Sequence, residues 1–195
     1  AQSGQGDDAK ATLSLIAENI ADRNSGFKNL VITDSSGNIV YEYEDIQGMK
    51  ESFFGFEELE GYSEGSTKIS KIYMNNEDYE TSVFYVAKSI DADGLNNIDG
   101  FAIEIIDLSK ISEILSKSSY GEGKGYLSVT DGTGCVLNYE GTAVQKIDDI
   151  SDSGIIDVMK STTKPTSADN NVDYNAGGKL GCYNYFTGAS TSNWK

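Results

Sequence analysis

Two stretches of the chain decide the fold because they repeat each other: LVITDSSGNIV at residues 30–40 and LSVTDGTGCVL at residues 127–137. Leucine, threonine, aspartate and glycine recur in place, with a constant offset of 97 residues. Each copy predicts two strands joined by a tight turn. Asp34 and Asp131 are suited to cap the turns, and the following glycines to take a positive φ. We therefore expect two copies of one small fold, each containing this hairpin.

A helix is predicted before each hairpin. Residues 10–23 carry apolar side chains at helical spacing, with Asp8 as the predicted N-cap and residues 24–26 as the end of the helix. The predicted buried face consists of Leu13, Ile16, Ala17 and Ile20. The same spacing recurs after Asp107, the second predicted N-cap. That face consists of Leu108, Ile111, Ile114 and Leu115.

Each hairpin is followed by further strands rich in β-branched and aromatic residues. The expected strands of the first copy are residues 66–74, 79–90 and 100–106. Those of the second copy are residues 171–175, 180–188 and a strand opening at Trp194, after a polar loop at residues 161–169. A helix, a hairpin, a crossover and three antiparallel strands form an α+β plan, so we expect one mixed-order antiparallel sheet per copy.

The composition excludes several classes of function. The 195 residues carry a net charge of −16, which repels the phosphates of nucleic acids and anionic lipid headgroups. The chain contains no histidine, so catalytic triads and imidazole metal sites are excluded. Two cysteines, Cys135 and Cys182, are too few for a disulfide scaffold or a cysteine-only zinc site.

No apolar run approaches the roughly 20 residues that span a bilayer. No secretion signal is visible, and the chain stops directly after Trp194 and Lys195. We interpret the sequence as a piece of a longer protein.

Three local features have competing interpretations. The turns at Asp34 and Asp131 faintly match the paired aspartates of aspartic proteases, but each has one extra residue before its glycine, which favours plain hairpin turns. The loop at residues 91–99 lacks the glycine and glutamate positions of a calcium loop, which favours a polar connection. Cys135 and Cys182 are expected on non-adjacent strands, which favours two buried free thiols over a disulfide.

An aromatic cluster lies in the crossover of the first copy. Phe53, Phe54 and Phe56 fall in an otherwise polar segment, where a group of aromatic side chains indicates a packing or binding role. They either cover the sheet as core or help to line a pocket, and the two roles are compatible.

Several segments, taken in order, resemble a known family. They are VITDSSG at residues 31–37, SVTDGTG at 128–134, DI at 45–46, FF at 53–54, LEG at 59–61, GFAIEIIDLS at 100–109 and TSNWK at 191–195. Their order and spacing resemble double Cache domains, the extracellular PAS-like sensors of bacterial chemoreceptors, histidine kinases and diguanylate cyclases.

The resemblance implies two tandem PAS-like (Cache) modules after an N-terminal helix. The helix would comprise residues 1–26, the membrane-distal module residues 27–107, and the linking helix with the membrane-proximal module residues 108–195, whose last strand is incomplete. The distal module would bind a small molecule, and membrane helices would flank the piece. The related receptors are dimers, so a homodimer is compatible with the resemblance.

A subset of the family binds amino acids through an Arg-x-Trp-Tyr group in the crossover, a strand tyrosine and an exit-strand aspartate. Here the crossover has no arginine or tryptophan, and the aspartate position falls at or near Ile105. Without the arginine, bidentate carboxylate binding is lost, so we predict that this chain does not bind α-amino acids in that way. The residues predicted to line a ligand site are Phe53, Phe54, Tyr73, Tyr85 and Lys88.

The sequence therefore predicts a non-catalytic, extracytoplasmic sensor region of a membrane-anchored bacterial receptor, with an unidentified small-molecule ligand. No cofactor, metal site, catalytic residue or nucleic-acid partner is expected. The alternative interpretation is a structural, dimerising or protein-binding ectodomain without a small-molecule ligand.

Overall fold

The computed structural model describes residues 3–44, 51–60, 65, 67–91, 94, 98–120, 125–161, 172–176, 179–183 and 194. The chain divides into two compact units, and neither is continuous in sequence. The first unit comprises Ala1–Ser70 and Asn75–Leu108, and the second comprises Lys71–Met74 and Ser109–Lys195. The four residues Lys71–Met74, the last two of which begin a strand of the first sheet, therefore belong by their contacts to the second unit.

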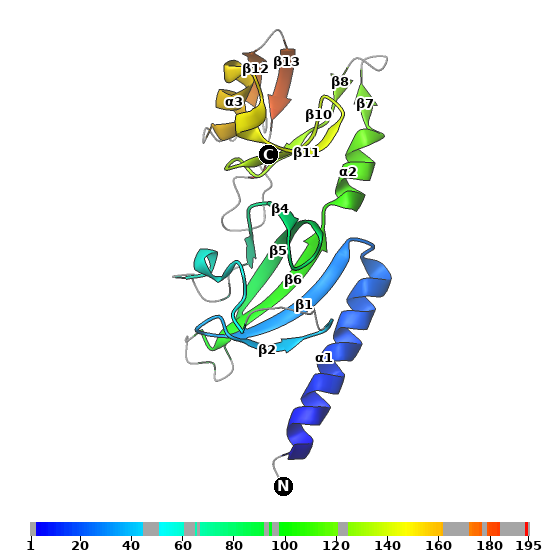
Figure 1. The fold of residues 1–195 in the computed structure, drawn as a ribbon, viewed down its shortest axis with the longest axis vertical. Coiled ribbons are helices and arrows are strands. Elements are labelled where there is room, and N and C mark those ends of the chain that lie inside the picture. Colours follow the sequence, from blue (N-terminus) through cyan, green and yellow to red (C-terminus); the bar gives the residue numbers. More distant parts are fainter. Residues whose placement is uncertain are drawn as a thin grey trace. The chain divides into compact units, whose positions relative to one another are not determined.

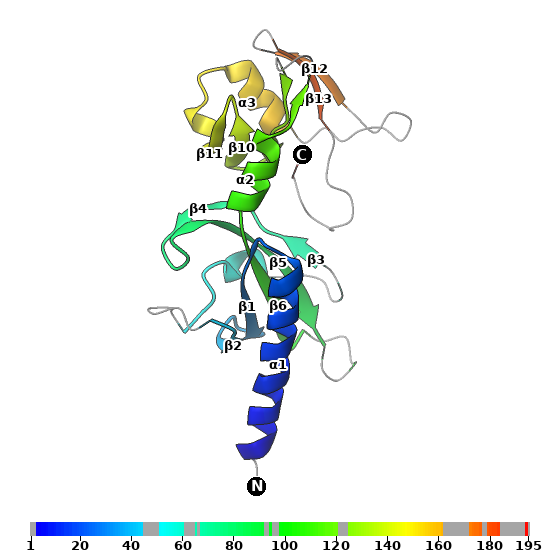
Figure 2. The same cartoon turned by 90° about the vertical axis from the view of Figure 1, so that its right-hand side faces the viewer.

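The first unit is built on one antiparallel sheet with the order β2-β1-β6-β5-β3, and β4 pairs with β5 outside this path (Figure 1; β3 is labelled in Figure 2). The strands are β1 (Phe27–Asp34), β2 (Ile39–Glu42), β3 (Thr67–Ile69), β4 (Tyr73–Asn76), β5 (Thr81–Ile90) and β6 (Gly100–Asp107). The antiparallel, mixed-order sheet confirms the α+β prediction for this unit. The single strand predicted at residues 66–74 was wrong, because β3 and β4 are separated by residues 70–72.

Helix α1 (Ser3–Arg23) packs on one face of this sheet, along β1 (Figure 1). Ala17 is fully buried in a cluster with Leu30 and Tyr41. The helix ends where the sequence predicted, since the Asn24 side chain accepts a hydrogen bond from the backbone of Gly26. It begins earlier than expected, so Asp8 lies inside the helix and is not its N-cap.

The predicted buried face of α1 contained one error. Leu13 and Ala17 contact the cluster, but Ile16 is 45% exposed. The side chain of Ser14 lies inward instead and shares a 3.1 Å hydrogen bond with the Tyr41 hydroxyl. Ser14, and not Ile16, therefore contributes to this interface.

The second unit contains short strands, two α-helices and a 3₁₀ turn (Figure 2). The helices are α2 (Ser109–Ser116) and α3 (Ser153–Lys160), and the 3₁₀ turn is η2 (Ile147–Asp149). The strands are β7 (Ser119–Tyr120), β8 (Gly125–Tyr126), β9 (Val129–Thr130), β10 (Cys135–Tyr139), β11 (Thr142–Lys146), β12 (Val172–Ala176) and β13 (Lys179–Tyr183). They form a three-stranded sheet β11-β10-β9 and two hairpins, β12-β13 and β7-β8.

Its hydrophobic core lies between β10, η2 and α3, and Figure 2 shows β10 beside α3. The buried side chains are Val136, Tyr139, Ile147, Ile150, Ile155 and Met159. Helix α2 departs from the prediction: Leu115 is buried, but Ile114 is 66% exposed. Asp107 is the last residue of β6 and is separated from α2 by Leu108. Trp194 is buried but not part of a strand.

The two predicted hairpins have the same pattern of backbone hydrogen bonds. The amide of Asp34 donates to the carbonyl of Asn38 at 2.9 Å, and the amide of Asp131 donates to that of Cys135 at 3.2 Å. In both copies the carbonyl of the turn glycine accepts a 2.9 Å bond from the crossover that follows, at Gly37 and at Gly134. The sequence repeat is therefore matched by a repeated local structure.

The positive-φ position differs between the copies. Gly37 has φ +84°, as predicted, whereas the second turn places its positive φ at Gly132 and not at Gly134. Each turn aspartate accepts hydrogen bonds from its own turn, which fits a capping role and not a protease dyad.

No helix in the described part of the chain is both long and apolar enough to cross a membrane. Nor do the residues that the structure describes contain a group of three or more side chains able to hold a metal ion. In the loop at residues 91–99, the Asp91 carboxylate accepts a bond from the amide of Gly94, and most of the remaining loop lies outside the described residues.

Candidate functional site

The candidate site lies on the face of the first sheet opposite α1, called here the inner face. Side chains alternate along a strand, and Leu30 and Ile32 of β1 point toward α1, so Asn29, Val31 and Thr33 point to the inner face. The register extends this face to the neighbouring strands, because Val31 lies opposite Ile103, which lies opposite Ala87. The inner face comprises Asn29, Val31, Thr33, Val83, Tyr85, Ala87, Phe101, Ile103 and Ile105.

A crossover segment, residues 51–59, is attached to this part of the first unit by hydrogen bonds. The amide of Phe53 donates to the carbonyl of Gly37, and the amide of Ile39 donates to that of Glu51, both at 2.9 Å. From the sheet, the hydroxyl of Tyr85 donates a buried 2.9 Å bond to the carbonyl of Gly55. The first hairpin and the middle of β5 thus hold the segment from two sides.

Four rings form an aromatic cluster, defined as Phe53, Phe54, Tyr79 and Tyr85. The ring centroids of Phe53 and Phe54 are 4.6 Å apart, and those of Phe53 and Tyr85 are 5.2 Å apart in an edge-on arrangement. The ring centroids of Phe54 and Tyr79 are 6.1 Å apart. Such offset contacts stabilise aromatic pairs beyond the area they bury. Phe54 is only partly buried, whereas the other three rings are almost fully buried.

Among the described residues of this unit, two buried hydroxyls lack a well-formed hydrogen bond: Thr33 Oγ1 and the Tyr79 hydroxyl. Thr33 is 2% exposed and Tyr79 is 3% exposed. Burial raises the pKa of Tyr79 above its usual value, nearby carboxylates add to the rise, and the Asn29 side chain opposes it. The tyrosine therefore stays protonated and keeps both its donor and its acceptor capacity.

One cation lies at the end of the crossover segment. Lys68 of β3 is paired with Ala87 of β5, so it shares the inner face. Its ammonium group donates to the carbonyl of Glu58 and lies 4.0 Å from the carboxylate of the same residue. The sequence pattern did not predict this contact, because the face on which a strand residue lies depends on the register of the strand.

The structure brings together three of the five residues predicted to line a ligand site. Phe53, Phe54 and Tyr85 belong to the aromatic cluster. Lys88 is exposed and points to the opposite face of β5 from Tyr85. Tyr73 belongs to the second unit, where the ammonium of Lys71 lies 5.1 Å from its ring centroid.

Two residues of the inner region were missed by the sequence reasoning, Tyr79 and Lys68. Tyr79 was expected at the start of a strand but lies in the turn before β5. A tyrosine at the end of a turn-forming cluster could have drawn attention, since turns rarely carry buried aromatic residues.

No protein-family model matches the chain, and no curated protein sequence matches it. Solved structures do match. The ligand-binding domain of the Pseudomonas aeruginosa amino acid chemoreceptor PctC, in complex with GABA, aligns with a TM-score of 0.54 at 12% identity, over 89% of this chain and 73% of that one. The ligand-binding domain of the Pseudomonas fluorescens chemoreceptor CtaA, in complex with L-isoleucine, aligns at 0.54 and 15% identity, over 97% and 84%.

The extracellular domain of a histidine kinase, mmHK1S-Z2, aligns with a TM-score of 0.53 at 16% identity, over 80% of this chain and 68% of that one. At these identities the likeness concerns the fold. The chain has the fold of ligand-binding domains from chemoreceptors and sensor kinases, consistent with a Cache sensor domain. The resemblance inferred from the repeated hairpins is confirmed at this level.

Proposed function

We propose that this chain is the extracytoplasmic ligand-sensing region of a bacterial signal-transduction receptor: a chemoreceptor, a sensor kinase or a diguanylate cyclase. It would consist of two tandem Cache modules, at residues 27–107 and 108–195, without catalysis of its own. Support comes from the fold shared with receptor ligand-binding domains and from the hairpin hydrogen bonds that recur in both units. The parent protein would be anchored in the cell membrane.

The ligand would be a small molecule bound at the inner face of the first unit, beside the aromatic cluster. The observation that carries this proposal is the attachment of an aromatic crossover segment to the sheet by the Tyr85–Gly55 hydrogen bond. Binding sites combine apolar and aromatic walls with a few polar groups. Phe54 would supply the wall, and the hydroxyls of Thr33 and Tyr79 would supply polar contacts, since buried groups without a well-formed hydrogen bond are rare in native folds.

Binding of α-amino acids by the Arg-x-Trp-Tyr mode remains a negative prediction. Ile105, at or near the position of the aspartate that would hold an ammonium group, is fully buried on the inner face beside Tyr85. An aliphatic side chain there offers no charge to an ammonium group. We therefore expect a ligand recognised mainly through apolar, aromatic and hydroxyl contacts.

Differential scanning fluorimetry with a library of acids, amines, sugars and nucleobases tests the proposal. A ligand at about 100 times its Kd stabilises the folded state by about 2.7 kcal/mol, which is a clear shift in Tm. Phe54→Ala should abolish the shift, whereas Lys88→Ala, on the opposite face, should keep it. A library without any stabilising compound, or a full shift in Phe54→Ala, would overturn the inner-face site.

The alternative, a dimerising ectodomain, is favoured by one observation. Leu15 and Ile16 are neighbours on α1 and are 61% and 45% exposed. Contiguous exposed apolar patches mark contact surfaces, and these two side chains would belong to such a patch in a dimer. Sedimentation velocity should then show a concentration-dependent dimer that Leu15→Glu disrupts. A monomer at all concentrations would exclude this alternative for the isolated chain.

A further inference from the structure

A single carboxylate in the second unit carries an unusual set of partners. One oxygen of Asp131 accepts hydrogen bonds from the amides of Thr133, Gly134 and Cys135 at 2.8–3.0 Å. Its other oxygen accepts a 2.9 Å bond from the amide of Ile72, which lies 59 residues earlier in the chain. Asp131 is 2% exposed and Ile72 is 4% exposed, so the bond is shielded from water.

The same hairpin also binds the carbonyl of Ile72. The thiol of Cys135 lies 3.9 Å from that oxygen and donates a weak hydrogen bond to it. Cys135 is free, and burial raises the pKa of its thiol to about 11, so the donor proton is retained at neutral pH. Both backbone groups of Ile72 are therefore held by one hairpin, and we name Ile72, Asp131 and Cys135 the clasp.

The first hairpin has the same aspartate but no clasp. One oxygen of Asp34 accepts bonds from its own turn, and the other accepts a 2.8 Å bond from the side-chain amide of Asn38. The residue equivalent to Asn38 in the repeat is Cys135, which has no amide to offer. The second oxygen of Asp131 is thus available to a distant segment, whereas that of Asp34 is used locally.

The segment held by the clasp continues at both ends into the first unit. Lys71–Met74 belong to the second unit, while Ser70 and Asn75 belong to the first. Ser70 is fully buried and exchanges two hydrogen bonds with Tyr85: its amide donates to the Tyr85 carbonyl at 3.0 Å, and its hydroxyl accepts from the Tyr85 amide at 2.9 Å. Only Lys71 separates this attachment from Ile72.

We propose that the clasp is a mechanical link that couples the middle of β5 to the hairpin of the second unit. A displacement of Tyr85 carries Ser70 with it, and the chain from Ser70 to Ile72 is too short to absorb the movement without straining the bond to Asp131. Charge-assisted hydrogen bonds to a buried carboxylate are among the stronger polar contacts, so the link resists rupture. The link is a property of the chain without ligand and does not depend on the proposed function.

Hydrogen exchange measured by NMR tests the link directly. Asp131→Asn keeps the shape of the side chain. Its single oxygen should face the three amides of the turn, which leaves the NH₂ group facing the N–H of Ile72. The amide of Ile72 should exchange at least about tenfold faster, because it loses a bond to a charged group. The amide of Tyr85 should also exchange faster. In the matched control, Asp34→Asn, both rates should stay unchanged. Unchanged rates at Ile72 and Tyr85 in Asp131→Asn would overturn the proposal.

Transmission is tested by a double-mutant comparison. Trp194 is the only tryptophan and lies in the second unit, so its fluorescence reports that unit. Ile103→Val weakens the core of the first unit and should lower the urea midpoint seen by Trp194. In the Asp131→Asn background that shift should fall by at least half. Equal shifts in both backgrounds, or no shift in either, would contradict the link.

If Asp131→Asn does not fold, Cys135→Ala replaces it in both experiments, because it removes only the thiol contact and keeps the carboxylate. The expected changes have the same direction and are smaller. No change in either measurement would count against the clasp in the same way.

Discussion

Gly37, at the tip of the first hairpin, is restricted by its backbone and by a neighbour. Its φ of +84° lies in the left-handed region, where a side chain costs about 1–2 kcal/mol. A Cβ atom at this position would also lie 2.3 Å from the ring of Phe56. The ring centroids of Phe56 and Phe101 are in turn 6.0 Å apart. The turn thus serves as a docking point for the crossover segment as well as a link between strands.

We expect Gly37→Ala to lower the free energy of unfolding by about 3 kcal/mol, the sum of backbone strain and overpacking against Phe56. The matched control is Gly65→Ala in the same unit, with φ +69° and open space around the added methyl group. It should cost only about 1 kcal/mol. Urea unfolding measures both. Equal losses in the two variants would show that Phe56 imposes no constraint.

Part of the candidate site could be predicted at the level of single residues. Phe53 and Phe54 were predictable as site residues, because aromatic side chains in a polar crossover are expected to pack against a partner. The structure places them against Tyr85. For Lys88 and Tyr73, the sequence could not show whether they belong to the candidate site. The face of a strand residue depends on register, and the unit to which Tyr73 belongs depends on contacts with distant residues.

At the scale of elements, α3 shows how a short helix of eight residues is stabilised. The side chain of Asp152 accepts hydrogen bonds from the amides of Gly154 and Ile155, at 3.0 and 3.2 Å. Ile155 and Met159 then enter the core of the second unit. A helix this short is unstable alone, so the cap and the buried face act together.

Asp152→Ala should therefore lower the free energy of unfolding by about 1 kcal/mol, the usual cost of losing an N-cap. Urea unfolding followed by Trp194 fluorescence measures the loss. Asp157→Ala removes the same charge from an exposed position of α3 without touching the cap, and it should be close to neutral. A similar loss in both variants would attribute the effect to charge and not to capping.

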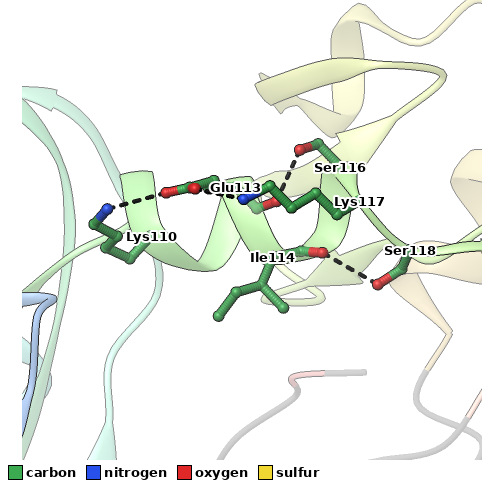
Figure 3. A network of polar contacts seen from close by, with 6 residues as sticks. All are labelled: Lys110, Glu113, Ile114, Ser116, Lys117 and Ser118. Carbon is green, nitrogen blue, oxygen red and sulfur yellow. Dashed lines mark hydrogen bonds and ion pairs between the residues drawn. The ribbon is translucent and has the colours of Figure 1, made fainter.

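Helix α2 carries an exposed ionic network instead of a long apolar stripe (Figure 3). Glu113 forms ion pairs with Lys110 at 3.0 Å and with Lys117 at 2.6 Å. Hydrogen bonds from these two lysines lower the pKa of Glu113 from its ordinary value of 4.5 to about 2. The carboxylate is fully exposed, so its contribution to stability is small.

The direction of the pH dependence follows from the lowered pKa of Glu113. A depressed folded-state pKa stabilises the protein above pH 4.5, and the stabilisation disappears as the pH falls from 4.5 toward 2. Glu113→Gln should therefore slightly lower the Tm at pH 7, and the difference from the wild type should shrink below pH 4.5. Thermal scans between pH 7 and pH 3 measure this. A difference that grows on acidification would contradict the assignment.

The strands illustrate the limit of sequence patterns. The repeat predicted both hairpins, because alternation and turn residues are local signals. The strand expected at residues 66–74 reads as continuous, yet the structure breaks it where Ile72 is bound by Asp131. A partner 59 residues away leaves no local trace, so only the folded chain reveals the interruption.

For the molecule as a whole, the dominant electrostatic feature is the excess of acidic groups: 31 aspartates and glutamates against 15 lysines and arginines. A net charge of −16 opposes the compact state through self-repulsion. Salt screens this repulsion, because the Debye length falls from about 30 Å at 0.01 M to about 8 Å at 0.15 M.

We expect the Tm to rise by several degrees between about 10 mM and 150 mM NaCl, since screening relieves more repulsion than the few ion pairs lose. KCl at the same ionic strength should produce the same rise, which separates screening from specific ion binding. Thermal scans in both salts measure it. A constant or falling Tm would mean that the acidic groups do not destabilise the fold.

The division of the chain into two interlocked sets of residues has a consequence for biosynthesis. Ile72 is translated 59 residues before Asp131, so the first sheet leaves the ribosome while one of its connecting segments still has no acceptor for that amide. The backbone of Ile72 can form its final hydrogen bonds only after the second hairpin has emerged. Genetic truncation after Leu108 would make this transient state permanent, with the backbone of Ile72 left to water.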